Sequence, residues 1–308
     1  MSCLKENFME GETMTVKKII LSIGLIVCLL VFQTVGCGGK KPAGWKITQY
    51  GDAEGNQLMC YVIEDAAGNL ALVDGGYEED AAAVREMIRK HGNHVSAWII
   101  THPHPDHVGA FNVIMADPGD IQVDAVYTVE VHHDRYWETA QDYDRFDMYE
   151  TFLGLTGGME TLRYVYEGDE FDVLGLRAKV LHVWDETTDA LEVNLCNNGS
   201  MVFLLSGEED QMLFCADAEN ETEPYILERH GEELGDVDYV QTGHHGNWGP
   251  TLDFYDVMSP KGAFMDAPNW LVETEDAGYD AWILKDYFEE KGTEVYSFGT
   301  APNEITLY

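Results

Sequence analysis

The feature that most constrains the fold of this chain is the run HPHPDH at residues 102–107. It places three of the 11 histidines of a 308-residue chain within six positions. The hydrophobic residues 95–100 lead directly into it and predict a buried strand. Side chains two residues apart on an extended segment point the same way, and each proline disfavours helix in the residue before it. We therefore expect His102 and His104 to face one point in space.

This residue set predicts a metal site. Imidazole nitrogen and carboxylate oxygen are ligands of Zn²⁺ and similar divalent metals. We expect His102 and His104 to bind one metal, and Asp106 and His107 to face a second metal beside it, where a helix over residues 108–115 begins. A surface loop that is merely rich in histidine is the alternative. The succession of strand, ligand loop and helix favours a preorganised site.

The run resembles the HxHxDH signature of the metallo-β-lactamase superfamily. The resemblance implies an α/β fold, a four-layered αββα sandwich with one or two metals at its edge. It extends from Trp45 to the C-terminus. Residues 58–63 and 71–76 resemble the opening hairpin and Asp-Gly-Gly turn of the family, and residues 212–217 resemble the strand that ends in its metal-bridging Asp. Asp217 is therefore expected to bridge two metals.

A second motif, Gly-His-His-Gly at residues 243–246, resembles one branch of the superfamily. That branch includes the hydrolase domain of DNA-uptake competence proteins and the cell-wall phosphorylcholine esterases. The resemblance implies that one of the two histidines binds metal and that the other protonates the leaving oxygen or holds the substrate. We predict that His244 is the ligand because it comes first after a strand, which leaves His245 as the catalytic acid. Asn247 and Trp248 are expected to bind substrate.

One departure from the family concerns a further metal-binding His that many members carry in a Gly-His-Thr segment. The corresponding residues 191–200 contain no His. His182, in a run that reads as an ordinary strand, is a candidate substitute. Without a substitute, the metal at His102 and His104 keeps an open position for water or substrate, as catalytic sites require.

The resemblance implies two divalent metals, with Zn²⁺ preferred and Mn²⁺ as the alternative. Two such ions share a water and lower its pKa, so that a bridging hydroxide attacks phosphorus or a carbonyl. Asp106 and His245 are the predicted catalytic residues. We predict a dinuclear-zinc phosphodiesterase or related ester hydrolase acting on a small or cell-envelope substrate. The alternatives are an extracellular nuclease of the competence-protein type and a non-catalytic metal-binding lipoprotein.

The charge of the chain bears on its partners. With 18 basic and 56 acidic residues, the net charge is −38. Such a chain repels polyanions, which disfavours nucleic acid as a substrate. Residues 131–160 mix aromatic and acidic side chains, which suits either a lid that meets a cationic group or an amphipathic helix over the core. His132 and His133 in this segment are expected to line the site.

The N-terminus predicts the compartment. Two lysines precede an apolar run at residues 19–32, and small residues follow before Cys37. This order is typical of a signal peptide over residues 1–36, with Met14 as an alternative start. It resembles a bacterial lipoprotein signal, in which Cys37 carries the lipid; an uncleaved anchor is the alternative. Both place the protein outside the cytoplasm on a membrane surface.

The expected organisation is a signal peptide, a tether over residues 37–44 and one hydrolase domain over residues 45–308. Three cysteines, Cys60, Cys196 and Cys215, remain after the lipid-bearing one. An odd number leaves no complete disulfide framework. Cys60 and Cys215 are expected to be buried apolar side chains, with metal contact as an alternative for Cys215.

Overall fold

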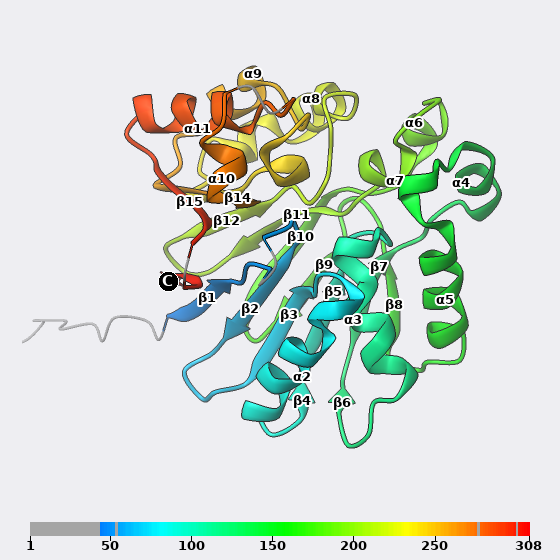
Figure 1. Ribbon diagram of the computed structural model, residues 1–308. Coiled ribbons are helices and arrows are strands. Elements are labelled where there is room, and N and C mark those ends of the chain that lie inside the picture. Colours follow the sequence, from blue (N-terminus) through cyan, green and yellow to red (C-terminus); the bar gives the residue numbers. More distant parts are fainter. Residues whose placement is uncertain (1–43, 53–54, 276–277, 300) are drawn as a thin grey trace, which may run out of the picture. The chain divides into compact units, whose positions relative to one another are not determined.

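Two seven-stranded sheets form the frame of the protein in the computed structural model (Figure 1), which describes residues 44–52, 55–275, 278–299 and 301–308. The first sheet has, in spatial order, the strands β16 (Asn303–Leu307), β1 (Trp45–Gln49), β2 (Cys60–Glu64), β3 (Leu70–Asp74), β5 (Ala97–Ile100), β7 (Val126–Val129) and β8 (Leu162–Val165). The second has β15 (Glu294–Phe298), β14 (Gly262–Pro268), β13 (Tyr239–Gln241), β12 (Gln211–Phe214), β11 (Val202–Ser206), β10 (Leu176–His182) and β9 (Glu170–Val173). A separate pair joins β4 (His94–Val95) and β6 (Gln122–Val123).

Each sheet is antiparallel on one side and parallel on the other. In the first sheet, β3, β5, β7 and β8 are parallel, and in the second, β12, β13, β14 and β15 are parallel. Loops at the carboxyl ends of parallel strands are the usual location of ligand sites in such sheets. The segments that follow β5, β12 and β13 hold the His and Asp residues singled out in the sequence.

Helices cover both outer faces of the paired sheets (Figure 1). The first sheet is accompanied by η1 (Glu78–Asp80), α2 (Ala81–Lys90), α3 (Pro105–Ala116), α4 (His133–Thr139), η2 (Asp142–Asp144) and α5 (Phe146–Thr156). The second is accompanied by α6 (Glu186–Asp189), α7 (Leu195–Asn198), α8 (Glu223–Leu234), η3 (Gly243–Gly246), α9 (Leu252–Asp256), α10 (Asn269–Val272) and α11 (Ala281–Glu290).

Two hydrophobic clusters hold these layers together. Between the sheets, the ring of Tyr61 on β2 packs edge-on against Phe214 and Phe264 of the second sheet, at centroid distances of 5.2 and 6.1 Å. Outside the second sheet, Ile226 of α8 and Phe288 of α11 belong to a separate buried cluster with strand residues. Burial of this apolar surface is the main force that stabilises the sandwich. The predicted αββα fold is confirmed.

The predicted order of strand, ligand loop and helix is confirmed around residues 102–107. Strand β5 is fully buried, and α3 begins at Pro105, where the absence of an amide hydrogen has no cost. The helix therefore starts three residues earlier than predicted and carries Asp106 and His107 in its first turn. Gly109 allows α3 to lie against the turn after β3, since a Cβ there would come within 2.5 Å of the Glu78 backbone nitrogen.

The predicted signal peptide and the lipid on Cys37 lie outside the described residues, so they stay predictions. Among the helices of the described residues, none is long and apolar enough to cross a membrane. Cys60 and Cys215 are buried and free, as expected, and Cys196 is buried and free as well. The segment 131–160 forms α4, η2 and α5, which pack aromatic side chains against the core, so the amphipathic interpretation applies to most of it.

Candidate metal centre

Four side chains form the first of two possible metal-binding groups, here termed subsite 2. Asp106, His107, Asp217 and His245 each offer a ligand atom, and these atoms all lie within 4.8 Å of one another. Oδ2 of Asp217 lies 3.3 Å from Nε2 of both His107 and His245. Oδ2 of Asp106 lies 3.0 Å from Nε2 of His245. Two carboxylates and two imidazoles therefore converge on one point.

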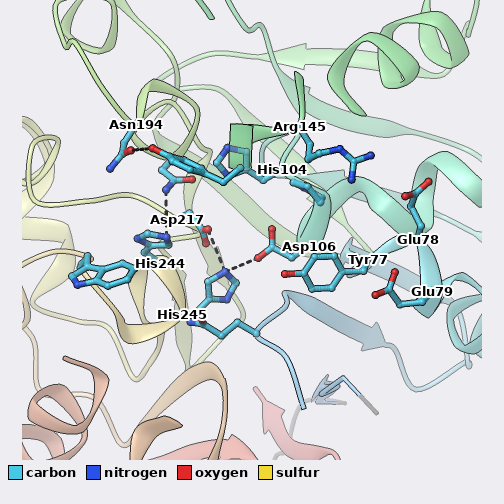
Figure 2. A pocket seen from close by; sticks show the side chains of 15 residues that line it. Tyr77, Glu78, Glu79, His104, Asp106, Arg145, Asn194, Asp217, His244 and His245 are labelled. Carbon is cyan, nitrogen blue, oxygen red and sulfur yellow. Dashed lines mark hydrogen bonds and ion pairs between the residues drawn. The ribbon is translucent and has the colours of Figure 1, made fainter. Parts of the chain in front are cut away.

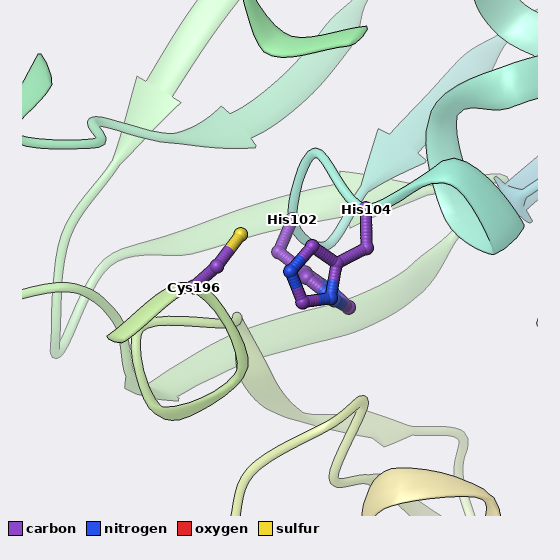
Figure 3. A group of neighbouring side chains, drawn as sticks. All are labelled: His102, His104 and Cys196. Carbon is purple, nitrogen blue, oxygen red and sulfur yellow. The ribbon is translucent and has the colours of Figure 1, made fainter. Parts of the chain in front are cut away.

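The second group, termed subsite 1, consists of His102, His104 and Cys196, whose ligand atoms also lie within 4.8 Å of one another (Figure 3). Nε2 of His102 lies 3.8 Å from Oδ2 of Asp217. Because the same oxygen approaches His107 and His245, Asp217 is next to both subsites. Its position suits the bridging role that the sequence motif implies.

The other ring nitrogen of each histidine is held by the protein. Metal-binding histidines commonly donate this second N–H to a carboxylate, a carbonyl or another acceptor, which fixes the tautomer and the ring orientation. The partners are the hydroxyl of Thr101 for Nδ1 of His102 at 3.2 Å, Asp144 for Nε2 of His104 at 2.7 Å, Asp74 for Nδ1 of His107 at 2.8 Å, and the carbonyl of Asp266 for Nδ1 of His245 at 3.1 Å.

The nitrogens that face the centre have no such partner. Nε2 of His102, His107 and His245 and Oδ1 of Asp217 are buried without a hydrogen bond. Buried polar atoms without partners cost free energy, and clusters of them in one place call for a ligand. Imidazole, carboxylate and thiol donors suit borderline divalent metals. The residues present therefore fit two divalent metal ions.

The ionisation of these groups reflects their crowding. Although burial opposes it, the carboxylates of Asp217 and Asp106 raise the pKa of His245 to about 10. The same carboxylates raise the pKa of His107, against the effect of burial. Burial lowers the pKa of His102 well below its ordinary value. In the metal-free protein, protons on His107 and His245 thus occupy the positions that cations would take.

Unusual backbone geometry delivers the second-sheet ligands. Ala216, His244 and His245 have φ values of 47°, 46° and 59°, in the left-handed region that side chains other than glycine rarely adopt. Such strain is concentrated at functional sites because it aims particular side chains. Gly243 permits the close approach this turn requires, since a Cβ there would lie 2.4 Å from the ring of Pro250.

A cavity of about 670 Å³ opens over the two subsites (Figure 2). Its volume is in the range of small-molecule sites. Metal-centre residues form one part of its wall, and acidic and aromatic residues form another. The lining residues are Gln57, Tyr77, Glu78, Glu79, His104, Pro105, Asp106, Tyr143, Arg145, Asn194, Asn197, Asp217, His244, His245 and Trp248.

The geometry does not support the prediction that His244 is the ligand and His245 the acid. His245 lies in subsite 2, whereas His244 belongs to neither group. Nε2 of His244 lies 3.4 Å from the amide nitrogen of Asn197, and its Nδ1 lies 3.3 Å from Oε1 of Glu219. The left-handed conformation of both residues turns the second histidine, not the first, toward Asp217.

The other predicted site residues divide into two groups. Trp248 lines the cavity as predicted, but Asn247 does not; its side chain is buried and accepts a hydrogen bond from the Ala281 backbone at 3.1 Å. His132 and His133 also lie outside the lining, because Asp189 holds the ring of His132 at 2.8 Å and His133 packs on Phe146.

His182 does not replace the missing ligand. Its Nε2 lies 2.7 Å from the carbonyl of Asn198, and it belongs to neither metal-binding group of the described residues. Cys215, the cysteine considered for metal contact, is buried in the cluster outside the second sheet.

Several residues of the site carried no recognised signal in the sequence. Glu219 is buried beside Asp217, and burial raises its pKa to about 7 although the amides of Asn197 and Asn194 oppose the shift. Tyr143 confirms that an aromatic of segment 131–160 reaches the cavity. Cys196 could have been recognised from the sequence, because it lies in the stretch where the family places its additional His.

Comparison with known proteins assigns the family. Residues 54–263 match the sequence profile of the Metallo-beta-lactamase superfamily. The chain belongs to this superfamily. The superfamily is largely hydrolytic and binds divalent metals, in agreement with the two ligand groups. No curated protein matches the chain.

Solved structures of similar fold cover most of the chain. The metallo-beta-lactamase fold protein YhfI from Bacillus subtilis has a TM-score of 0.53 and 10% identity over 86% of this chain and 99% of that one. CmlA, a diiron beta-hydroxylase from Streptomyces venezuelae, has a TM-score of 0.54 and 15% identity over 85% and 54% of the two chains. Unliganded yeast PDE1 has a TM-score of 0.51 and 12% identity over 86% and 99%. At these identities the likeness shows the fold alone.

Proposed function

We propose that this metallo-β-lactamase-fold protein is a hydrolase that uses two metals, with zinc as the native ion, to cleave a phosphodiester or related ester. The observation that carries the proposal is the position of Asp217, whose Oδ2 lies between His102, His107 and His245 at the wall of the cavity. When bound, two such metals supply an activated water and stabilise negative charge that develops on the substrate.

The first histidine of the Gly-His-His-Gly element supports ester cleavage. His244 lines the cavity but belongs to neither metal group, so its ring can contact the substrate instead of a metal. Burial lowers the pKa of His244 to about 4, so at neutral pH the ring is neutral in the metal-free protein. The Asn197 amide donates toward Nε2, which leaves the proton on Nδ1, beside Glu219. We assign His244 the role of holding the leaving group with this neutral ring.

The far wall of the cavity supports a substrate with a positively charged end. Glu78 and Glu79 lie together beside Tyr77 and away from His244 (Figure 2). Arg145 is the one lysine or arginine among the described residues of this lining. Its guanidinium is paired with Asp147 at 2.9 Å. A zwitterionic diester, such as one ending in phosphocholine, would place its phosphate at the metals and its cation near the acids and aromatics. The net charge of −38 also repels DNA, which is a polyanion.

The proposal includes the compartment. An apolar run before Cys37 supports export and lipid attachment, and a cell-envelope ester would then be within reach of the site. Mass spectrometry of the membrane fraction should find lipid on Cys37, and Cys37→Ala should release the protein or leave an unprocessed precursor. A wild-type protein without lipid on this residue overturns the anchoring part alone.

The deciding assay compares a phosphocholine diester with single-stranded DNA at equal phosphodiester concentration, with zinc, at two salt concentrations. We expect the small substrate to be cleaved faster, and the relative rate on DNA to rise with salt because screening weakens repulsion. Glu78→Gln with Glu79→Gln should raise KM for the phosphocholine substrate several-fold at low salt, whereas the matched control Glu86→Gln on α2 should not. Faster cleavage of DNA at low salt contradicts the substrate class and favours a nuclease.

A further inference from the structure

Cys196 stands in a place unlike that of the other described cysteines. Its side chain is 1% exposed on the short helix α7, and its sulfur points toward the rings of His102 and His104 (Figure 3). Cys60 and Cys215 lie on or beside buried strands within apolar clusters. Cys196 also packs in the core, but its sulfur faces polar groups on the side of the metal centre.

The neighbours of the sulfur leave three ligand atoms open toward one point. Nε2 of His104 is occupied by Asp144 at 2.7 Å, which leaves Nδ1 for an ion. Nδ1 of His102 is occupied by Thr101, which leaves the buried and unpaired Nε2. With the sulfur of Cys196, these nitrogens form a three-atom set within 4.8 Å.

The surroundings of the sulfur are also polar. The ring of His104 and the hydroxyl of Tyr136, a side chain only 1% exposed, both interact with Cys196. The Tyr136 hydroxyl donates its hydrogen to the carbonyl of Asp144 at 3.3 Å, which joins this side chain to the segment that holds His104. A cysteine that only filled core volume would need neither neighbour.

We propose that Cys196 is a thiolate ligand of subsite 1, which makes the two metal positions chemically different. The inference rests on the proposed function, because it requires the two-metal centre. On binding, the thiol proton leaves to solvent and a sulfur–metal bond forms, with no change of oxidation state. Subsite 1 then offers two nitrogens, a sulfur and the shared oxygen of Asp217, whereas subsite 2 offers two nitrogens and the oxygens of Asp106 and Asp217.

Metal selectivity follows from this difference. Thiolate favours Zn²⁺, Co²⁺ and Cd²⁺, whereas Mn²⁺ prefers carboxylate and water oxygen. The protein should therefore take up about two Zn²⁺ but retain only about one Mn²⁺, in subsite 2. Cys196 also lies in the stretch where the family places its additional His, so the chain would keep a third protein ligand at subsite 1 with sulfur in place of nitrogen.

Absorption of the full chain loaded with Co²⁺ tests the proposal directly. We expect an intense sulfur-to-cobalt charge-transfer band in the near ultraviolet for the wild type and for Cys60→Ser, the matched control with a buried cysteine elsewhere. Cys196→Ser should lose the band and about one of the two metals. Cys196→His should lose the band but keep both metals, and it should retain a second Mn²⁺ that the wild type does not.

The outcomes separate this inference from the proposed function. Two bound Co²⁺ and full ester cleavage without the band in the wild type overturn the thiolate ligand and leave the hydrolase intact. Failure to bind any metal overturns both. If Cys196→Ser does not fold, the wild-type spectrum and Cys196→His decide alone. A band that survives in Cys196→His also overturns the proposal, because its sulfur would belong to another cysteine.

Discussion

The two subsites share Asp217 but receive their support from different parts of the molecule. In subsite 2, His107 is held by Asp74 at the end of β3, and His245 is held by the carbonyl of Asp266 on β14. Asp74 and Asp266 are both fully buried within the sheets. Subsite 2 is therefore fixed by the frame of the sandwich, one strand from each sheet.

Subsite 1 depends instead on the segment that covers the site. Its His104 is held by Asp144 in η2, outside both sheets. The neighbouring residues Tyr143 and Arg145 line the substrate cavity. A substrate that contacts these two residues would therefore influence the position of Asp144, which orients His104. From this difference we expect one metal position to be rigid and the other to be coupled to substrate binding.

The strongest test of the comparison is the residue common to both subsites. Asp217→Asn should lower ester cleavage about a thousandfold, since it removes the charged oxygen that both groups share. Asp210→Asn is the matched control, because Asp210 is also a largely buried acid, in the turn between β11 and β12, but pairs with Lys261 at 2.7 Å. Turnover of bis-p-nitrophenyl phosphate by the folded variants measures the effect. Activity that survives in Asp217→Asn contradicts the shared centre.

The next largest effect on activity tests the roles of His244 and His245, which are the reverse of those predicted from the sequence. His245→Ala should lose about one metal and several hundredfold in rate, because it removes a ligand of subsite 2. His244→Ala should keep both metals and lose about a hundredfold in kcat, as expected when a side chain that holds the leaving group is removed. Measuring the metal content by mass spectrometry together with kcat distinguishes the two variants. Loss of metal in His244→Ala instead would restore the assignment made from the sequence.

The first-sheet ligands could be predicted from the sequence because they are contiguous. The run at residues 102–107 places four predicted ligands within one loop and the first turn of α3, so alternation along a strand and the helix start are enough to group them. Asp217 was found because it ends a strand that resembles a family motif. The grouping of residues 102–107 needs only local geometry, whereas Asp217 needs the family motif.

The ligands of the second sheet depend on features that local patterns do not contain. His245 rather than His244 faces the centre because both residues adopt left-handed backbone conformations, which no alternation rule anticipates. Asp144 and Cys196 approach His104 from segments 40 and 92 residues away in the chain, through packing of η2 and α7. Asn247, predicted to bind substrate, instead caps the start of α11. Only the tertiary fold decides these contacts.

The support of the imidazoles offers a finer test of the two subsites. Asp74→Asn should weaken the metal of subsite 2, and Asp144→Asn should weaken that of subsite 1, each by about ten- to a hundredfold. Titration of the metal-free protein in competition with a chromophoric chelator resolves the two affinities. We expect a substrate analogue to restore much of the affinity lost in Asp144→Asn but none in Asp74→Asn. Equal behaviour of both variants would remove the distinction between a rigid and a coupled position.

The smallest effect concerns protons that leave when metal binds. The carboxylates of Asp217 and Asp106 raise the pKa of His245 to about 10 against the effect of burial, so its ring is protonated at pH 7 in the metal-free protein. Metal must displace that proton, so the affinity of subsite 2 should rise about tenfold for each pH unit from 6 to 8 for each proton released. Calorimetry in buffers of different ionisation enthalpy counts the protons. His182→Asn is the matched control, because burial lowers the pKa of His182 and it lies in neither subsite. Affinity that does not change over this pH range would mean that His245 is already neutral in the metal-free protein, which contradicts the prediction.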